Sequence, residues 1–170
     1  KFVTVSVPLM SAASASVTTG NSAWQMLAQA QEGSGDRAGA LETLLGWRKA
    51  GGWEPDGLRR LADLLVEAKR EAEATEVLAA LNYVDPLAAP THAQLGERYL
   101  AAGRGTDALR EFRVLLALDP LDTATANFGL ARAHRLAGDL TLTRRHLLEA
   151  LETAPQYRPA QKLLLDIIGD

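Results

Sequence analysis

The chain has 170 residues, of which 47% are hydrophobic and 23% charged, the composition of a globular protein long enough to bury a core of its own. A formal net charge of -3 provides no basic surface for DNA or RNA, so no nucleic-acid partner is expected. The absence of cysteine excludes disulfides and thiolate chemistry but leaves the compartment open, either cytoplasmic or exported to a periplasm. No apolar run approaches the roughly 18 residues of a membrane helix, so no membrane span is expected.

Residues 1–20 predict a short extended, strand-like segment and linker, because valines alternate with other residues from 3 to 7 and a period of two is typical of a β-strand. Since the chain begins without methionine, this segment is interpreted as the end of an upstream domain in a larger protein. The alternative is a signal peptide with an A-x-A cleavage motif at 13–15. The polar Thr4 and Ser6 make a poor apolar core for such a peptide, which favours the strand.

From residue 21 onward the sequence repeats itself four times, at offsets of 34, 34 and 35 residues. A leucine followed by a small residue, a mid-repeat turn residue, a second small residue and a closing glycine or proline recur in register. The leucine column is Leu27, Leu61, Leu95 and Leu130, and the closing column is Gly52, Pro86, Pro120 and Pro155. The sequence therefore predicts four repeats at 21–54, 55–88, 89–123 and 124–157.

Each repeat is predicted to be a pair of helices, because apolar and small residues fall three and four positions apart, as at Leu58, Leu61 and Leu65. A glycine at the middle ends the first helix, and the closing proline ends the second. Lys69 occupies the glycine position of the second repeat, within a segment of strong helix formers. We expect a less sharply defined turn there, or a longer first helix.

This set of columns resembles the tetratricopeptide repeat (TPR), with an aromatic residue at the fourth position (Trp24), Leu-Gly-x-x-Tyr at 95–99, a turn glycine, then Ala108 and Phe112, and a closing proline. The resemblance covers roughly residues 21 to 168. It implies an all-α fold, an α-α superhelical solenoid of four TPR helical hairpins plus a C-terminal capping helix at 158–170. Stacking of hairpins buries the apolar stripe that one hairpin leaves open.

Within the capping helix, Leu164, Leu165 and Ile168 fall at first-helix positions that pack against the preceding hairpin. Leu163 and Ile167 are then expected off the packed stripe. They would be partly buried against the neighbouring helix or available to a partner.

Two tryptophans, Trp47 and Trp53, flank the Gly51-Gly52 turn between the first two repeats. We expect both rings to fill the gap between the first two hairpins. A display of either ring for binding is the less favoured interpretation.

The resemblance to the TPR family also implies the function of a protein-protein interaction scaffold, which binds a peptide or partner protein in a concave groove formed by the first helices. Mapped onto this chain, the groove positions are polar and net acidic in the first two repeats, and more apolar with two arginines in the last two. An apolar anchor near Leu100 and Phe128 and an acidic group near Arg132 and Arg135 would suit this gradient. The partner-binding candidates are Arg59, Asp63, Glu97, Leu100, Phe128, Arg132 and Arg135.

The sequence indicates no catalytic, cofactor or metal site. Two copies of G-x-G-x-x-A, at 33–38 and 103–108, occupy the same place in two helical repeats rather than the strand-to-helix turn that dinucleotide binding needs. The histidines His92, His134 and His146 have no carboxylate at metal-ligand spacing, and packed imidazoles are expected. We therefore expect a protein that is not itself an enzyme and uses no cofactor or metal.

Two other functions remain open. The chain is alternatively a substrate-recruiting or regulatory region of a multidomain enzyme such as a protease. It is alternatively an oligomerisation module that self-associates through the N-terminal segment or the capping helix.

Overall fold

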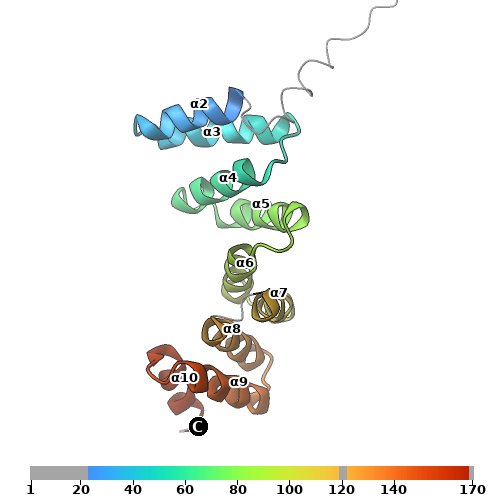
Figure 1. Ribbon diagram of the computed structural model, residues 1–170, viewed down its shortest axis with the longest axis vertical. Coiled ribbons are helices and arrows are strands. Elements are labelled where there is room, and N and C mark those ends of the chain that lie inside the picture. The colour runs from blue at the N-terminus through green and yellow to red at the C-terminus, as the bar shows by residue number, and fades with distance from the viewer. Residues whose placement is uncertain (1–22, 119–121, 169–170) are drawn as a thin grey trace, which may run out of the picture. The chain divides into compact units, whose positions relative to one another are not determined.

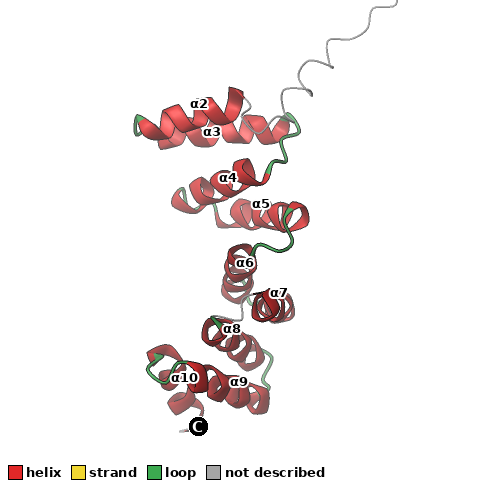
Figure 2. Cartoon of the chain, viewed as in Figure 1, coloured by secondary structure: helices red, strands yellow, loops and turns green. Residues whose placement is uncertain are grey.

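The computed structural model describes residues 23–118 and 122–168, so the extended segment predicted at 1–20 lies outside the described residues. Every regular element in the described ranges is an α-helix (Figure 2). The chain divides into two compact units, unit 1 (Lys1–Val84) and unit 2 (Asp85–Asp170). The prediction of an all-α fold is confirmed.

Within the described residues the helices of both units are paired as hairpins, apart from the last helix, which follows the last pair (Figure 1). Unit 1 contains α2 (Ala23–Gly33), α3 (Arg37–Lys49), α4 (Pro55–Glu67) and α5 (Glu71–Val84). Unit 2 contains α6 (Ala89–Ala101), α7 (Gly105–Leu118), α8 (Thr123–Leu136), α9 (Leu140–Thr153) and α10 (Arg158–Ile168). No helix in these described parts has the length and apolarity needed to cross a bilayer.

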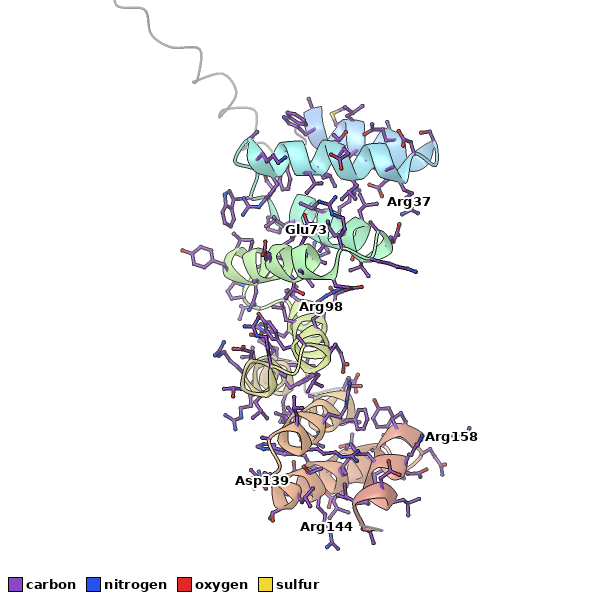
Figure 3. The ribbon with its side chains drawn as sticks, turned by 180° about the vertical axis from the view of Figure 1, so that it is seen from behind. Arg37, Glu73, Arg98, Asp139, Arg144 and Arg158 are labelled. Carbon is purple, nitrogen blue, oxygen red and sulfur yellow. The ribbon has the colours of Figure 1, made fainter. Side chains whose placement is uncertain are left out.

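Aspartates begin three of the helices, because a carboxylate can accept the backbone N–H groups that the first turn leaves without a partner. Asp36 accepts from the backbone N–H of Gly39 at the start of α3. Asp122 does the same for α8, and Asp139, labelled in Figure 3, for α9. In α4 and α6 a proline occupies the first turn instead, where its missing N–H is not needed.

The four hairpin turns share one backbone geometry. Gly35, Gly103 and Gly138 have positive φ angles of 87°, 71° and 78°, which glycine adopts without steric cost. In every turn this residue donates its N–H to the carbonyl three residues earlier, and the next residue donates to the carbonyl five residues earlier. These bonds satisfy the last carbonyls of the first helix, as in a Schellman motif.

Lys69 makes the same turn, with a φ of 59° and hydrogen bonds of 2.9 Å in both places. The expectation of a looser turn or a longer helix was wrong. The two hydrogen bonds and the packing of α4 against α5 fix a left-handed residue here, although a side chain makes that conformation unfavourable.

In unit 1 the indole of Trp47 is completely buried in a slot between two glycines. A Cβ atom on Gly52 would overlap the indole, and one on Gly57 of α4 would lie 2.5 Å from it. Trp47 therefore fills the gap between the first two hairpins, as predicted. Trp53 does not, because it is 45% exposed and lies under the Arg48 guanidinium, 3.8 Å from the ring centroid.

In unit 2 the corresponding ring is Phe112 on α7, which is 1% exposed. A Cβ atom on Gly96 of α6 would lie 2.7 Å from the ring, and one on Gly129 of α8 would overlap it. The ring belongs to a core cluster with Leu115 and Leu130. Both hairpins of unit 2 thus meet around one phenylalanine.

The register of the capping helix α10 differs from the prediction. Ala160 and Leu163 are buried with α8 and α9, whereas Leu165 and Ile168 are 70% and 61% exposed. The buried face falls one position earlier than the repeat spacing predicts. The buried side chains of α10 pack on Ala131 of α8 and on Leu147 and Ala150 of α9.

Candidate functional site

Unit 2 carries an open pocket of about 660 Å³ between α6, α8 and α10. Its walls combine apolar and charged side chains. The lining residues are Leu100, Phe128, Arg132, Arg135, Leu136, Pro159, Lys162, Leu163 and Asp166. Pockets with apolar walls and a few polar groups are the common form of ligand site.

Five of the seven candidate residues from the sequence are gathered here. Leu100, Phe128, Arg132 and Arg135 line the pocket. Glu97 lies beside it, one turn before Leu100 on α6, and both of its carboxylate oxygens accept from Arg132, at 2.6 and 2.7 Å.

Phe128 is held by aromatic and cationic neighbours. Its ring meets that of Tyr157 edge to face, with centroids 5.3 Å apart and planes at 84°, a favourable geometry for an aromatic pair. The Arg132 guanidinium lies 5.5 Å from the Phe128 centroid, within the range of a cation–π contact. These two contacts hold the Phe128 ring in place at the pocket.

The cations of the pocket differ in how they are satisfied. Arg132 is bound to Glu97 and is 35% exposed. Arg135 and Lys162 are both exposed, and within the described residues neither forms an ion pair or hydrogen bond. Arg135 and Lys162 are thus the cations available to an incoming group.

The contribution of α10 was missed by the sequence analysis. Pro159, Lys162, Leu163 and Asp166 form one wall of the pocket. A signal was present, because Pro159, Lys162 and Asp166 occupy positions 2, 5 and 9 of a fifth repeat that starts at Arg158. Positions 5 and 9 also supplied five of the seven candidates in the earlier repeats.

The other two candidates, Arg59 and Asp63, line a separate pocket of about 400 Å³ in unit 1. Its three arginines are engaged by neighbouring acids within the unit. Arg37, labelled in Figure 3, lies 2.9 Å from Glu67. The remaining pairs are Arg59 with Asp56 at 2.8 Å and Arg60 with Glu32 at 3.3 Å.

The histidines are buried in unit 2. Both ring nitrogens of His92 face oxygen atoms, Nδ1 the Glu111 carboxylate at 2.7 Å and Nε2 the Pro86 carbonyl at 3.0 Å. His134 stacks on His146, with ring centroids 5.5 Å apart. Burial, reinforced by the charge of His146, lowers the pKa of His134. In the described ranges no three His, Asp or Glu side chains are grouped as metal ligands.

Tandem helical hairpins with left-handed turns and an open first-helix surface define a class of helical repeat protein. No protein-family model and no curated protein matches the chain. Among solved structures, it is similar to YrrB, a TPR protein with an unusual peptide-binding site, with a TM-score of 0.71 and 17% identity over 84% of this chain and 73% of YrrB.

Two further solved structures agree in fold. MamA from Desulfovibrio magneticus RS-1 matches with a TM-score of 0.69 and 19% identity, covering 83% of this chain and 79% of MamA. A TPR protein from Parabacteroides merdae matches with a TM-score of 0.66 and 17% identity, covering 84% of this chain and 56% of the other. The chain has a tetratricopeptide-repeat fold, as the repeated columns of its sequence predict.

Proposed function

We propose that the chain is a protein-protein interaction scaffold that binds a peptide or partner protein in the pocket of unit 2. The observation that carries the proposal is the open pocket itself, in which apolar side chains lie next to cations without partners. The peptide-binding site of the similar protein YrrB supports this use of the fold.

The apolar wall supplies the energy of such an interaction. Leu136 is 50% exposed, and Leu100 and Phe128 are half-buried at the same pocket. An apolar side chain of the partner would remove these surfaces from water, with a gain of roughly 25 cal/mol per Å². A few such contacts at the centre of an interface usually carry most of its affinity.

The pocket of unit 1 is the weaker candidate. Its arginines already bind acids of the same unit, so a charged ligand would have to replace existing ion pairs. Exchanging one exposed ion pair for another gains little free energy.

A pair of matched substitutions tests the proposal. Leu136→Gln alters the pocket, whereas Leu148→Gln alters a leucine of similar exposure, 44%, on α9 outside it. Both variants and the wild type are used for affinity capture from the source cells, and circular dichroism verifies that they fold. We expect a partner that Leu136→Gln loses and Leu148→Gln retains; equal capture by both variants would overturn the proposal.

Self-association is a second candidate function, favoured by the apolar face of α2. Trp24 and Leu27 are 39% and 51% exposed, although the equivalent residues of the second repeat, Leu58 and Leu61, are completely buried. In unit 1 the helix α3 with Trp47 packs over α4, so the face of α2 fits another helix of that kind.

Sedimentation measurements over a range of protein concentrations test self-association. We expect the mass of the wild type to rise with concentration and that of Leu27→Gln to stay at one chain. A wild type of constant single-chain mass would exclude this second function while leaving the first in place.

A further inference from the structure

We infer that the segment bound in the pocket of unit 2 is an acidic peptide, and that Arg135 of α8 and Lys162 of α10 together form the receptor for its carboxylate. The inference rests on the proposed function, since it specifies the chemistry of the partner at the same pocket. It differs from the sequence-based expectation, which assigned the acidic group to Arg132 and Arg135.

Arg132 is unsuited to be the main receptor because its charge is already matched. Both oxygens of Glu97 lie within 2.7 Å of its Nη1 atom, and its guanidinium also lies over Phe128. An incoming carboxylate would have to compete with Glu97, and the exchange would leave one acid without its cation. Arg132 therefore acts as a positioning residue for the Phe128 ring.

The remaining charges of the pocket do not cancel. Once Glu97 is set against Arg132, two cations, Arg135 and Lys162, face one acid, Asp166. None of these three side chains is engaged in an ion pair within the described residues. The free charge of the pocket is thus positive although the whole chain is negative, and a local field of this sign attracts acidic segments.

The positions of the charges also orient the ligand. Asp166 follows Lys162 by one helical turn on α10, so a carboxylate near Asp166 is repelled and one near Arg135 is not. The guanidinium of Arg135 can form a bidentate pair with that carboxylate, and Lys162 adds a second positive charge. Leu100 and Leu136 lie at the same pocket, where they can receive an apolar side chain next to the acidic one.

A role for α10 follows from this arrangement. Its inner face, with Ala160 and Leu163, is packed against the preceding hairpin, while Lys162 remains exposed at the pocket. The capping helix thereby closes the core and also supplies one of the two receptor cations.

Selection from short random-sequence peptides on phage tests the inference. The full chain is used as bait in three forms: wild type, Arg135→Gln with Lys162→Gln, and a control with Arg113→Gln and Arg144→Gln. The control removes the same charge from exposed positions on α7 and α9 outside the pocket; Arg144 is labelled in Figure 3.

We expect wild type and control to enrich peptides rich in Asp and Glu with an apolar residue, and the receptor variant to lose the acidic preference while keeping the apolar one. For one acidic peptide from the selection, the receptor variant should bind about tenfold more weakly. That loss should shrink at high salt, and replacing Glu by Gln in the peptide should reproduce it.

Failure of the inference and failure of the proposed function give different results. One result would contradict the inference alone: peptides are enriched and their binding depends on Leu136, but they show no acidic preference. An acidic preference that is equal for the wild type and the receptor variant would have the same meaning. In both cases the proposed function stands. If no peptide is enriched by any form of the protein, the inference is overturned, and the capture experiment with Leu136→Gln and Leu148→Gln decides the proposed function separately. If the control loses the acidic preference as well, general charge attraction replaces the assigned receptor.

Discussion

Units 1 and 2 each bury one large aromatic ring, but the space for it is made in different places. Trp47 of unit 1 fits because Gly52 follows it in the loop and Gly57 faces it from α4. Phe112 of unit 2 fits because Gly96 and Gly129 face it from the helices on either side. In both cases a large aromatic ring packs against glycines, which have no side chain. The packing density therefore stays close to that of a normal protein interior.

The exposed first-helix surfaces of the two units differ more than their interiors. The pocket of unit 1 is a set of mutually satisfied ion pairs, whereas that of unit 2 joins apolar surface to cations without partners. A repeated interior therefore supports two surfaces of different binding capacity. This difference is why the proposed binding site is placed in unit 2.

The largest effect is expected from removing the central ring of unit 2. Phe112→Ala should lower the free energy of unfolding by about 3–5 kcal/mol, because it removes buried apolar area and leaves a cavity between three helices. Urea denaturation followed by circular dichroism measures the change. A loss below about 1 kcal/mol would mean that the hairpins collapse onto the gap and that the ring does not hold unit 2 together.

A smaller loss should follow from filling the slot. Gly129→Ala places a Cβ atom against Phe112 and should cost about 1–3 kcal/mol by overpacking, despite the better helix propensity of alanine. Gly33→Ala is the matched control, since no atom lies within 4 Å of that position. Combining Gly129→Ala with Phe112→Leu should recover part of the loss in a double-mutant cycle. Simple additivity would contradict the proposed compensation.

Acid should destabilise unit 2 more than unit 1, because His134, whose pKa is lowered, lies in unit 2. All three tryptophans lie in unit 1. Burial, the charges of His146, Arg113 and Arg145, and the opposing charge of Asp139 leave the pKa of His134 below its usual value. The unfolded chain therefore binds a proton first as the pH falls through about 6.5, and stability that is complete above this pH is progressively lost below it.

Two spectroscopic probes distinguish the loss of stability of unit 2 from that of unit 1. Circular dichroism reports on the helices of both units, whereas tryptophan fluorescence reports on unit 1 alone. The stability measured by circular dichroism should therefore fall more between about pH 7 and pH 5 than that measured by fluorescence. His134→Gln should reduce the pH dependence. An unchanged slope in that variant would assign the effect to another group.

The smallest change in stability is expected at the surface of unit 2. Glu97→Gln removes the partner of Arg132, an exposed pair that contributes no more than about 1 kcal/mol. Acidic peptides should then bind a few-fold more tightly, because a third cation becomes available at the pocket. Titration calorimetry of the variant against wild type measures this gain, and weaker binding would show that Glu97 acts on Phe128 through Arg132.

The sequence was sufficient for the helices and most of the turns, because these depend on local patterns. The three- and four-residue spacing predicts α4 around Leu58 and Leu61, and the glycines at 103 and 138 predict left-handed turns. Lys69 was misjudged because its conformation is imposed by the flanking helices rather than by its own preference. Leu163 was misjudged because α10 packs on α8 and α9 through a face one position earlier than the repeat spacing predicts.

The candidate site was predicted in part for a related reason. Leu100, Phe128 and Arg135 line one pocket because equivalent repeat positions lie on neighbouring first helices. Glu97 and Arg132 both occupy position 9, in the third and fourth repeats, and they form an ion pair between these repeats. Such ion pairs decide which cations have no partner. They depend on the distances between side chains of neighbouring helices, which the sequence alone does not give.

The paired aromatic rings and glycines have a consequence for how the chain could be rearranged. An array built from identical modules tolerates shuffling, because every junction is the same. Here Trp47 of the first repeat packs against Gly57 of the second, and Phe112 of the third repeat packs against Gly129 of the fourth. A chimera with its modules exchanged would set a tryptophan against a side chain and a leucine against an empty slot. The side chains at each contact between repeats therefore fit only the present order of the repeats. Duplicating one repeat would require a compensating substitution in its neighbour.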